Sequence, residues 1–161
     1  MSVVLAEASK LKRQGEPIIA AACHCRDCSE GSRRLEALPT AQPILDSYGG
    51  TPYLLYRRDR VNCKKGGEFL KSIKVEENSS KRVFTSGCNS YMYLDLNRRM
   101  HWVPIFRGQF HGEAPAIEMR INAKFGPGTE NVRSDVPFFS SLPFKFVRKL
   151  LAAKLAMIFH R

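Results

Sequence analysis

The chain has 161 residues, a length that fits one domain and is short for two. Hydrophobic residues make up 43% and charged residues 25%, a globular composition that excludes the disordered, collagen-like and coiled-coil classes. The 26 Lys and Arg residues outnumber the 15 Asp and Glu residues, and the resulting charge of +11 predicts attraction to phosphates, anionic lipids or small polyanions without choosing among them.

Short apolar runs separated by turn residues predict a mainly β, antiparallel protein. The runs cover residues 18–22, 53–56, 68–75, 82–86, 91–96 and 101–106. Apolar and polar residues alternate only in part within these runs. The sequence therefore predicts the strands but not which face of each strand is buried.

A different pattern follows Pro143, where apolar residues recur every three or four positions and predict an amphipathic helix over about 143–159. Its apolar face consists of Phe144, Val147, Leu151, Leu155 and Ile158. Lysine and arginine residues interrupt the segment, so we expect no membrane-spanning helix. Two roles stay open for this helix, which are docking on the sheet and attachment to an anionic membrane surface or an acidic partner.

Three of the five cysteines, Cys23, Cys25 and Cys28, fall within six residues, directly after the first predicted strand. A disulfide between such close neighbours is strained and leaves one thiol over. Because the N-terminal residues also lack a secretory pattern, we expect a reducing, cytoplasmic setting. Three thiolates on one loop suit zinc and leave its fourth position open.

Two other interpretations of the cysteines stay open. Cys25 and Cys28 have the spacing of a redox dithiol, although that motif normally opens a helix in a βαβ unit, which this sequence does not predict. Buried cysteines also act as small hydrophobic residues, although a cluster flanked by charged residues is not typical of a core. His24 is not counted as a ligand, because the backbone between two ligands would turn its ring away.

Three motifs, in this order, resemble the glutathione-dependent formaldehyde-activating enzyme family, which includes centromere protein V-like proteins. Residues 23–28 match its Cys-His-Cys-x-x-Cys element, residues 67–70 match its Gly-Glu turn, and residues 82–90 match its Arg-x-Phe segment. The resemblance covers residues 4–106. It implies a β-tent of small antiparallel sheets over about 1–112, in a single domain whose C-terminal extension is 113–161.

The chain departs from the family where a structural zinc would be held. In the family, a first Cys-x-Cys pair and a last Cys-x-x-Cys pair share this ion, and the middle three cysteines hold a second zinc. The first pair corresponds to Val4 and Ala6, and Thr85 replaces a third ligand, so that only Cys88 is left. The resemblance therefore implies that packing, such as Val4 against Val83, replaces the structural site.

The resemblance also implies a reaction. A zinc ion on Cys23, Cys25 and Cys28 would serve a carbon–sulfur lyase that joins formaldehyde to glutathione or cleaves the S-hydroxymethyl adduct. The neighbouring cations could bind the carboxylates of such a thiol or simply form a solvated basic turn. These cations are Arg26, Arg33 and Arg34.

Two further hypotheses remain. The chain could be a non-catalytic zinc module whose basic surface binds nucleic acid or an acidic partner, or a family-like protein without metal. In each case the charge of +11 predicts weak polyanion binding without sequence preference.

Overall fold

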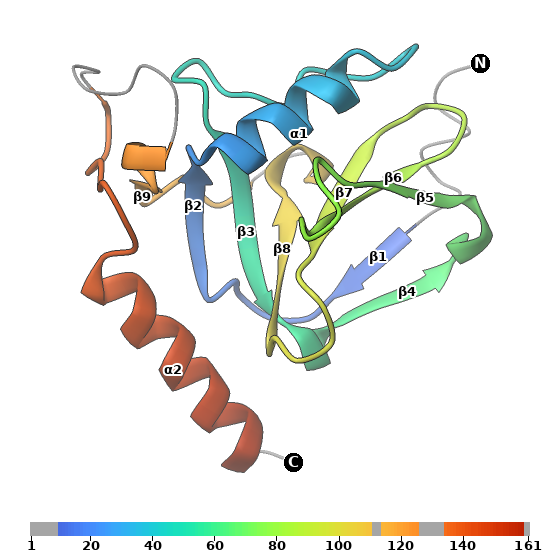
Figure 1. The fold of residues 1–161 in the computed structure, drawn as a ribbon. Coiled ribbons are helices and arrows are strands. Elements are labelled where there is room, and N and C mark those ends of the chain that lie inside the picture. The colour runs from blue at the N-terminus through green and yellow to red at the C-terminus, as the bar shows by residue number, and fades with distance from the viewer. Residues whose placement is uncertain (1–9, 111–113, 126–133, 160–161) are drawn as a thin grey trace.

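The computed structural model describes residues 10–110, 114–125 and 134–159 (Figure 1). A seven-stranded sheet has the order β5-β6-β7-β8-β3-β2-β9, and a two-stranded sheet pairs β1 with β4. The strands are β1 (Lys10–Arg13), β2 (Ile19–Cys23), β3 (Thr51–Arg57), β4 (Val61–Lys65), β5 (Leu70–Ile73), β6 (Lys81–Thr85), β7 (Tyr91–Asp95), β8 (Trp102–Phe106) and β9 (Met119–Ile121). The α-helices are α1 (Arg26–Glu36) and α2 (Phe144–Phe159), and single 3-10 turns occupy Arg58–Arg60, Gly67–Phe69, Arg107–Gln109 and Ala123–Phe125.

All six predicted runs contain a strand, and most of the pairing is antiparallel, as predicted. The purely antiparallel description is wrong in one place, because β9 pairs with β2 in parallel and makes the sheet mixed. Strands β1, β4 and β9 were not predicted. β1 and β4 are rich in lysine and arginine, and β9 has only three residues.

The central strands bury both faces, and the two faces belong to different clusters. Ile19, Ala21 and Tyr53 face the core that also contains side chains of α1 and α2. Ala20 and Leu54 face the opposite cluster, against which residues of β1 and β4 pack. The two-residue period of a strand thus places every second residue on the side of α1, where the last residue of β2 is Cys23.

Helix α1 was not predicted, because its buried face is built mainly from small residues. Cys28, Ser29, Gly31, Ser32 and Leu35 are buried, and only the last of these is large and apolar. Cys25 is the N-cap, with an extended backbone and a sulfur that accepts from the Cys28 backbone N–H. Asp27 in the first turn and arginines in the last turn fit the helix dipole. Arg33 and Arg34 therefore lie on a helix rather than on the predicted basic turn.

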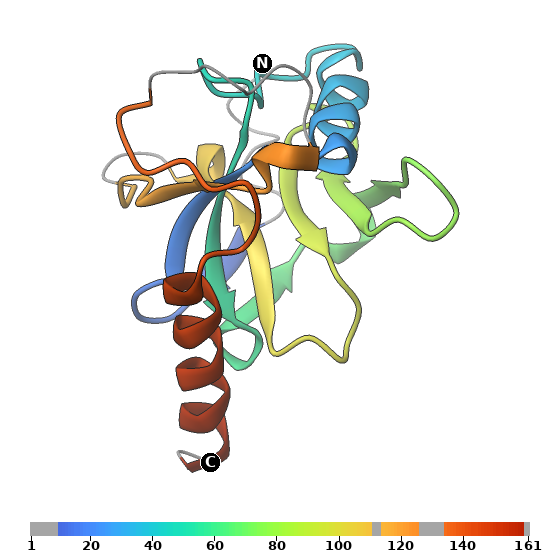
Figure 2. The same ribbon diagram turned by 60° about the vertical axis from the view of Figure 1, so that its left-hand side comes forward.

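Helix α2 confirms the predicted C-terminal helix, but it docks through other residues. Phe146 and Leu150 are buried, whereas the predicted apolar face is exposed to solvent. The helix is fixed by His101 Nε2, 2.7 Å from the Leu150 carbonyl, and by an ion pair between Lys149 and Glu118. Figure 2 shows α2 extending away from the sheet toward the C-terminus. Within the described part of the chain, no helix has the length and apolarity to cross a membrane.

Candidate metal centre

The junction between β2 and α1 brings the three predicted cysteine ligands together. The sulfurs of Cys23, Cys25 and Cys28 lie within 4.8 Å of one another, and those of Cys23 and Cys25 are 3.4 Å apart. A tetrahedral ion with metal–sulfur bonds of about 2.3 Å needs sulfurs about 3.8 Å apart. The cluster therefore has the spacing to hold a soft metal ion, and no other His, Cys, Asp or Glu of the described residues joins it.

The surroundings of the cluster favour negative charge on the sulfur of Cys25. Hydrogen bonds from the thiols of Cys23 and Cys28 lower the pKa of Cys25, and the nearby Arg82 lowers it further. The same hydrogen bonds stabilise the protonated form of the two donor thiols, and therefore raise the pKa of Cys23 and of Cys28. The Cys28 backbone N–H at the start of α1 points to Cys25 Sγ at 3.4 Å, and Asn122 Nδ2 lies 3.5 Å from Cys23 Sγ. A bound cation would replace the shared protons as the partner of these sulfurs.

His24 lies outside the cluster, as the sequence predicted. Its ring is buried against Phe138, with centroids 4.7 Å apart in an edge-to-face arrangement. A Cβ at Gly50 would lie 2.4 Å from His24 Nε2. The His24 ring therefore fits at this place only because residue 50 has no side chain. Burial lowers the pKa of His24, and Asp46 partly opposes this effect. His24 therefore packs in the core as a neutral side chain.

Arg82 supports the cluster from below α1, a role that the sequence analysis did not assign. Its side chain is 1% exposed. The guanidinium contacts the Asp27 carboxylate at 2.5 Å and the carbonyls of Asp27 and Ser80 at 2.6 and 3.0 Å. Its Nε has no hydrogen-bond partner among the residues that the structure describes. The Arg82 contacts thus fix the first turn of α1, on which Cys28 lies.

All three cysteines line one cavity of about 280 Å³. Its walls are mainly apolar and come from five strands, from the segment after β7 and from the start of α2. They include Tyr53, Leu55, Leu94, Trp102, Ile121 and Phe146. A metal ion on the three sulfurs would therefore face a cavity with mainly hydrocarbon walls.

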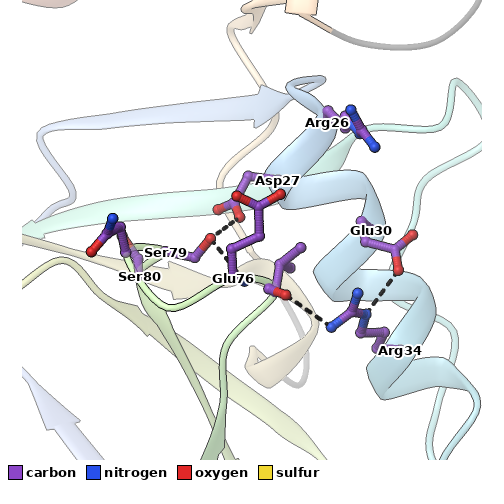
Figure 3. A pocket seen from close by; sticks show the side chains of 9 residues that line it. Arg26, Asp27, Glu30, Arg34, Glu76, Ser79 and Ser80 are labelled. Atoms are coloured by element: carbon purple, nitrogen blue, oxygen red, sulfur yellow. Dashed lines mark hydrogen bonds and ion pairs between the residues drawn. The ribbon is translucent and has the colours of Figure 1, made fainter.

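The predicted substrate-binding arginines lie elsewhere. Arg26 and Arg34 line a separate groove of about 670 Å³ between α1 and the segment that joins β5 to β6 (Figure 3). Arg34 is occupied by Glu30 at 2.8 Å and by the Val75 carbonyl at 3.1 Å. Arg33 is exposed and lines neither hollow. The groove and the cavity meet at Asp27 and Ser80, which line both.

Cys88 is not part of the cluster. Its sulfur lies 2.9 Å from Thr85 Oγ1 and accepts from Ser90 Oγ at 3.2 Å. These groups line a different cavity, beside Gln109 and Phe106. Val4 and Ala6, where the resemblance places two further lost ligands, lie outside the described residues, and so does the expected packing of Val4 on Val83.

Comparisons with known proteins give structural likenesses but no match in sequence. No protein-family model matches the chain, and no curated protein matches it in sequence. A crystal structure of a Rhodobacter sphaeroides protein, a structural-genomics target, is 17% identical with a TM-score of 0.45. The match covers 67% of this chain and 84% of that chain. These comparisons assign neither a family nor an activity.

Proposed function

We propose that the chain binds one zinc ion through Cys23, Cys25 and Cys28 and catalyses the reversible cleavage of a carbon–sulfur bond in a small thiol adduct. The observation that carries this proposal is the convergence of three sulfurs, without a fourth protein ligand among the described residues, on a cavity large enough for an organic molecule. A fully structural site would use four protein ligands, whereas a site that binds substrate keeps one position open.

The three thiolate ligands determine which reactions a bound zinc ion would support. Zinc on three thiolates supplies a Lewis acid that acidifies water less than a three-histidine site does, so an incoming sulfur suits it better than hydrolysis. In the adduct R–S–CH(OH)–R′, the C–S bond breaks, its electron pair stays on sulfur, the hydroxyl loses its proton and the carbon leaves as an aldehyde. The proton ends on the released thiol or in solvent, so no oxidant or reductant is needed.

Residues of the chain fit the remaining tasks. Asp27 places a carboxylate on the cavity wall. We assign Asp27 as the base that accepts the hydroxyl proton of the adduct. Its hydrogen bonds from Arg82 and Ser79, at 2.5 and 2.8 Å, hold it in place. The apolar walls make the surroundings of the sulfurs less polar than water, which strengthens electrostatic interactions with the adduct.

The resemblance to the glutathione-dependent formaldehyde-activating enzymes, with its β-tent fold, is part of the proposal. The small two-stranded sheet set beside the larger one supports it. So does the contact between Thr85 and Cys88, which stand where the resemblance puts two ligands of the lost structural zinc. By this resemblance glutathione is the first thiol to test.

Metal analysis tests the proposal. Protein purified without added metal should contain one equivalent of zinc, and replacing Cys23, Cys25 and Cys28 together by Ser should abolish it. Cys88→Ser is the matched control and should keep the full equivalent. Two equivalents, or zinc retained by the triple variant, would contradict the assignment of the ligands, and absence of zinc would contradict the function.

A further inference from the structure

The cavity at the cysteine cluster offers little to a charged ligand. Among its described lining residues, the polar side-chain groups outside the cysteines belong to Asp27, Ser80, Asn122, Tyr53 and the indole N–H of Trp102. Asn122 is directed to Cys23 Sγ, and Asp27 to Arg82. None of the described residues that line the cavity is a lysine or an arginine. A carboxylate drawn into this space would lose its hydration without gaining a cationic partner.

The walls suit a hydrocarbon group instead. Leu55, Leu94 and Trp102 from the sheet face the same space as Phe146 of α2 and Leu142 just before α2. Burial of apolar surface against such walls is favourable in proportion to the area removed from water. Of the two hollows that meet at Asp27, the groove is polar and holds the arginines, whereas the cavity with the cysteines is apolar.

We infer that the substrate of this centre carries an apolar alkyl or aryl group next to its sulfur, and that this group lies against Leu94, Trp102 and Phe146. This inference rests on the proposed function, which supplies the sulfur at the open metal position. It replaces glutathione and its S-hydroxymethyl adduct by thiols, or hydroxyalkyl thiol adducts, whose organic part is hydrophobic.

Cobalt-substituted protein tests the substrate class without an activity assay. A fourth sulfur should strengthen the sulfur-to-cobalt charge-transfer band, so thiol binding can be followed directly. We expect benzyl mercaptan to reach half-saturation at a concentration at least tenfold lower than glutathione or mercaptoethanesulfonate. Leu142→Lys, at an exposed position on the cavity wall just before α2, should weaken benzyl mercaptan binding at least tenfold, whereas Leu155→Lys, at an exposed position on α2 away from the cavity, should not.

The outcomes separate the two claims. Tighter binding of glutathione than of benzyl mercaptan would overturn the apolar substrate class and leave the proposed function standing. A cobalt spectrum that no thiol changes would show that the fourth position is closed and would overturn the proposed function. Equal affinities for all thiols, unaffected by Leu142→Lys, would show that the organic group does not enter the cavity.

A second inference comes from the surface of α2, which is independent of the cavity. Phe144, Val147, Leu151, Leu155 and Ile158 form a stripe along the helix, and each is exposed, from 39% at Val147 to 79% at Phe144. The docked residues Phe146 and Leu150 lie on the other side of the helix. The helix thus has two apolar faces, and one of them has no partner within the described part of the chain.

Positive charges flank this stripe. At 100° per residue, Arg148 and Lys154 fall on either side of the row formed by Leu151 and Leu155. Neither cation forms an ion pair within the described residues, whereas Lys149, on the docked side, binds Glu118. A second copy of the helix would bring like charges together. An exposed apolar stripe between cations complements a surface that is anionic outside and apolar beneath.

We propose that α2 lies in the headgroup region of an anionic membrane, with the stripe toward the acyl chains. The rest of the helix stays docked, and the net charge of +11 adds long-range attraction. Binding needs no rearrangement of the sheet, because α2 docks through Phe146 and Leu150 while its C-terminal end extends beyond the sheet (Figures 1 and 2).

Vesicle sedimentation tests this surface. We expect binding to vesicles of phosphatidylcholine with 30% phosphatidylserine to be at least tenfold tighter than to phosphatidylcholine alone. The double variant Leu151→Gln, Leu155→Gln should lose that binding while keeping its fold, since both positions are exposed. Phe69→Gln, at an exposed apolar position far along the chain, is the control. Equal binding to both vesicles, no binding, or a dimer in solution that the double variant dissolves would each refute the membrane assignment.

Discussion

Replacing Gly31 by Ala should destabilise the protein, although alanine is the better helix former. A Cβ at Gly31 would lie 1.8 Å from Arg82 Nε, 2.4 Å from its Cδ and 2.5 Å from its Cζ. Arg82 cannot swing aside, because it is buried and its guanidinium is held by Asp27 and the Ser80 carbonyl. Either α1 moves outward or the ion pair breaks.

The magnitude follows from three opposing effects. Helix propensity favours Ala over Gly by about 1 kcal/mol. Overpacking a filled interior costs about 1 to 3 kcal/mol. Complete loss of a buried ion pair costs about 3 to 5 kcal/mol, and only part of that applies here because the Asp27 side chain is 39% exposed. We expect a net loss of about 2 to 3 kcal/mol in the free energy of unfolding.

Urea unfolding followed by the fluorescence of the single tryptophan, Trp102, measures this loss. Gly67→Ala is the matched control, because nothing lies within 4 Å of its Cβ position, and it should leave stability unchanged or slightly raised. Cobalt affinity should also fall in Gly31→Ala, since α1 carries Cys28. A gain of about 1 kcal/mol in Gly31→Ala, the value expected from helix propensity alone, would refute the packing of Arg82 against α1.

Three further predictions concern metal, pH and charge. Chelation should leave cooperative thermal unfolding intact, because the two apolar clusters lie on both faces of the sheet, and loss of the transition would show a structural metal. Burial alone would raise the pKa of Glu118, but Lys149 and Lys145 outweigh it and lower this pKa. The stabilisation by Glu118 should therefore be complete above the unfolded value of about 4.3 and vanish as pH falls through the lower folded value, so that wild type and Glu118→Gln converge in acid unfolding curves. Labelled DNA duplexes of unrelated sequence should bind weakly and with equal affinity, with binding falling steeply as salt rises, and sequence-selective nanomolar binding would favour a nucleic-acid module.

The strands of the large sheet were predictable where side chains are apolar and turns are marked by glycine. β2, β3 and β8 each bury most of their residues. Strands that are buried on both faces have nearly continuous apolar sequences, which can be recognised without a structure. β1 and β4 pair with each other and carry several cations, which leaves no such run. β9 is short, and its partner β2 is nearly a hundred residues away along the chain.

The spacing of apolar residues in α2 predicted a helix but not which side of it docks. The regular series from Phe144 to Ile158 is the exposed one, and docking depends on Phe146 and Leu150. Periodicity shows that residues share a face. Which face is covered depends on the position of the sheet and of His101 and Glu118, which directly precede β8 and β9.

The cysteine cluster was predictable because its ligands are neighbours in sequence. The role of Arg82 was not, since it depends on a contact with Asp27, 55 residues away. The one sequence signal was its place in the Arg-x-Phe segment. Closeness in sequence predicts the arginines of α1 near the sulfurs, but the helix places them in the groove or in solvent, away from the sulfurs.

The small residues of α1, which make the helix hard to predict from sequence, also allow the cysteine cluster to form. Cys28, Ser32 and Gly31 are weak helix formers, but their small size lets α1 lie close to the sheet, where Ser32 Oγ is 2.8 Å from Thr51 Oγ1. The same small residues leave room for the Arg82 guanidinium beside the first turn. Large apolar residues on this face would have made the helix easy to predict. They would also have held it farther from the sheet, with Cys28 out of reach of Cys23 and no space for the cation that lowers the pKa of Cys25.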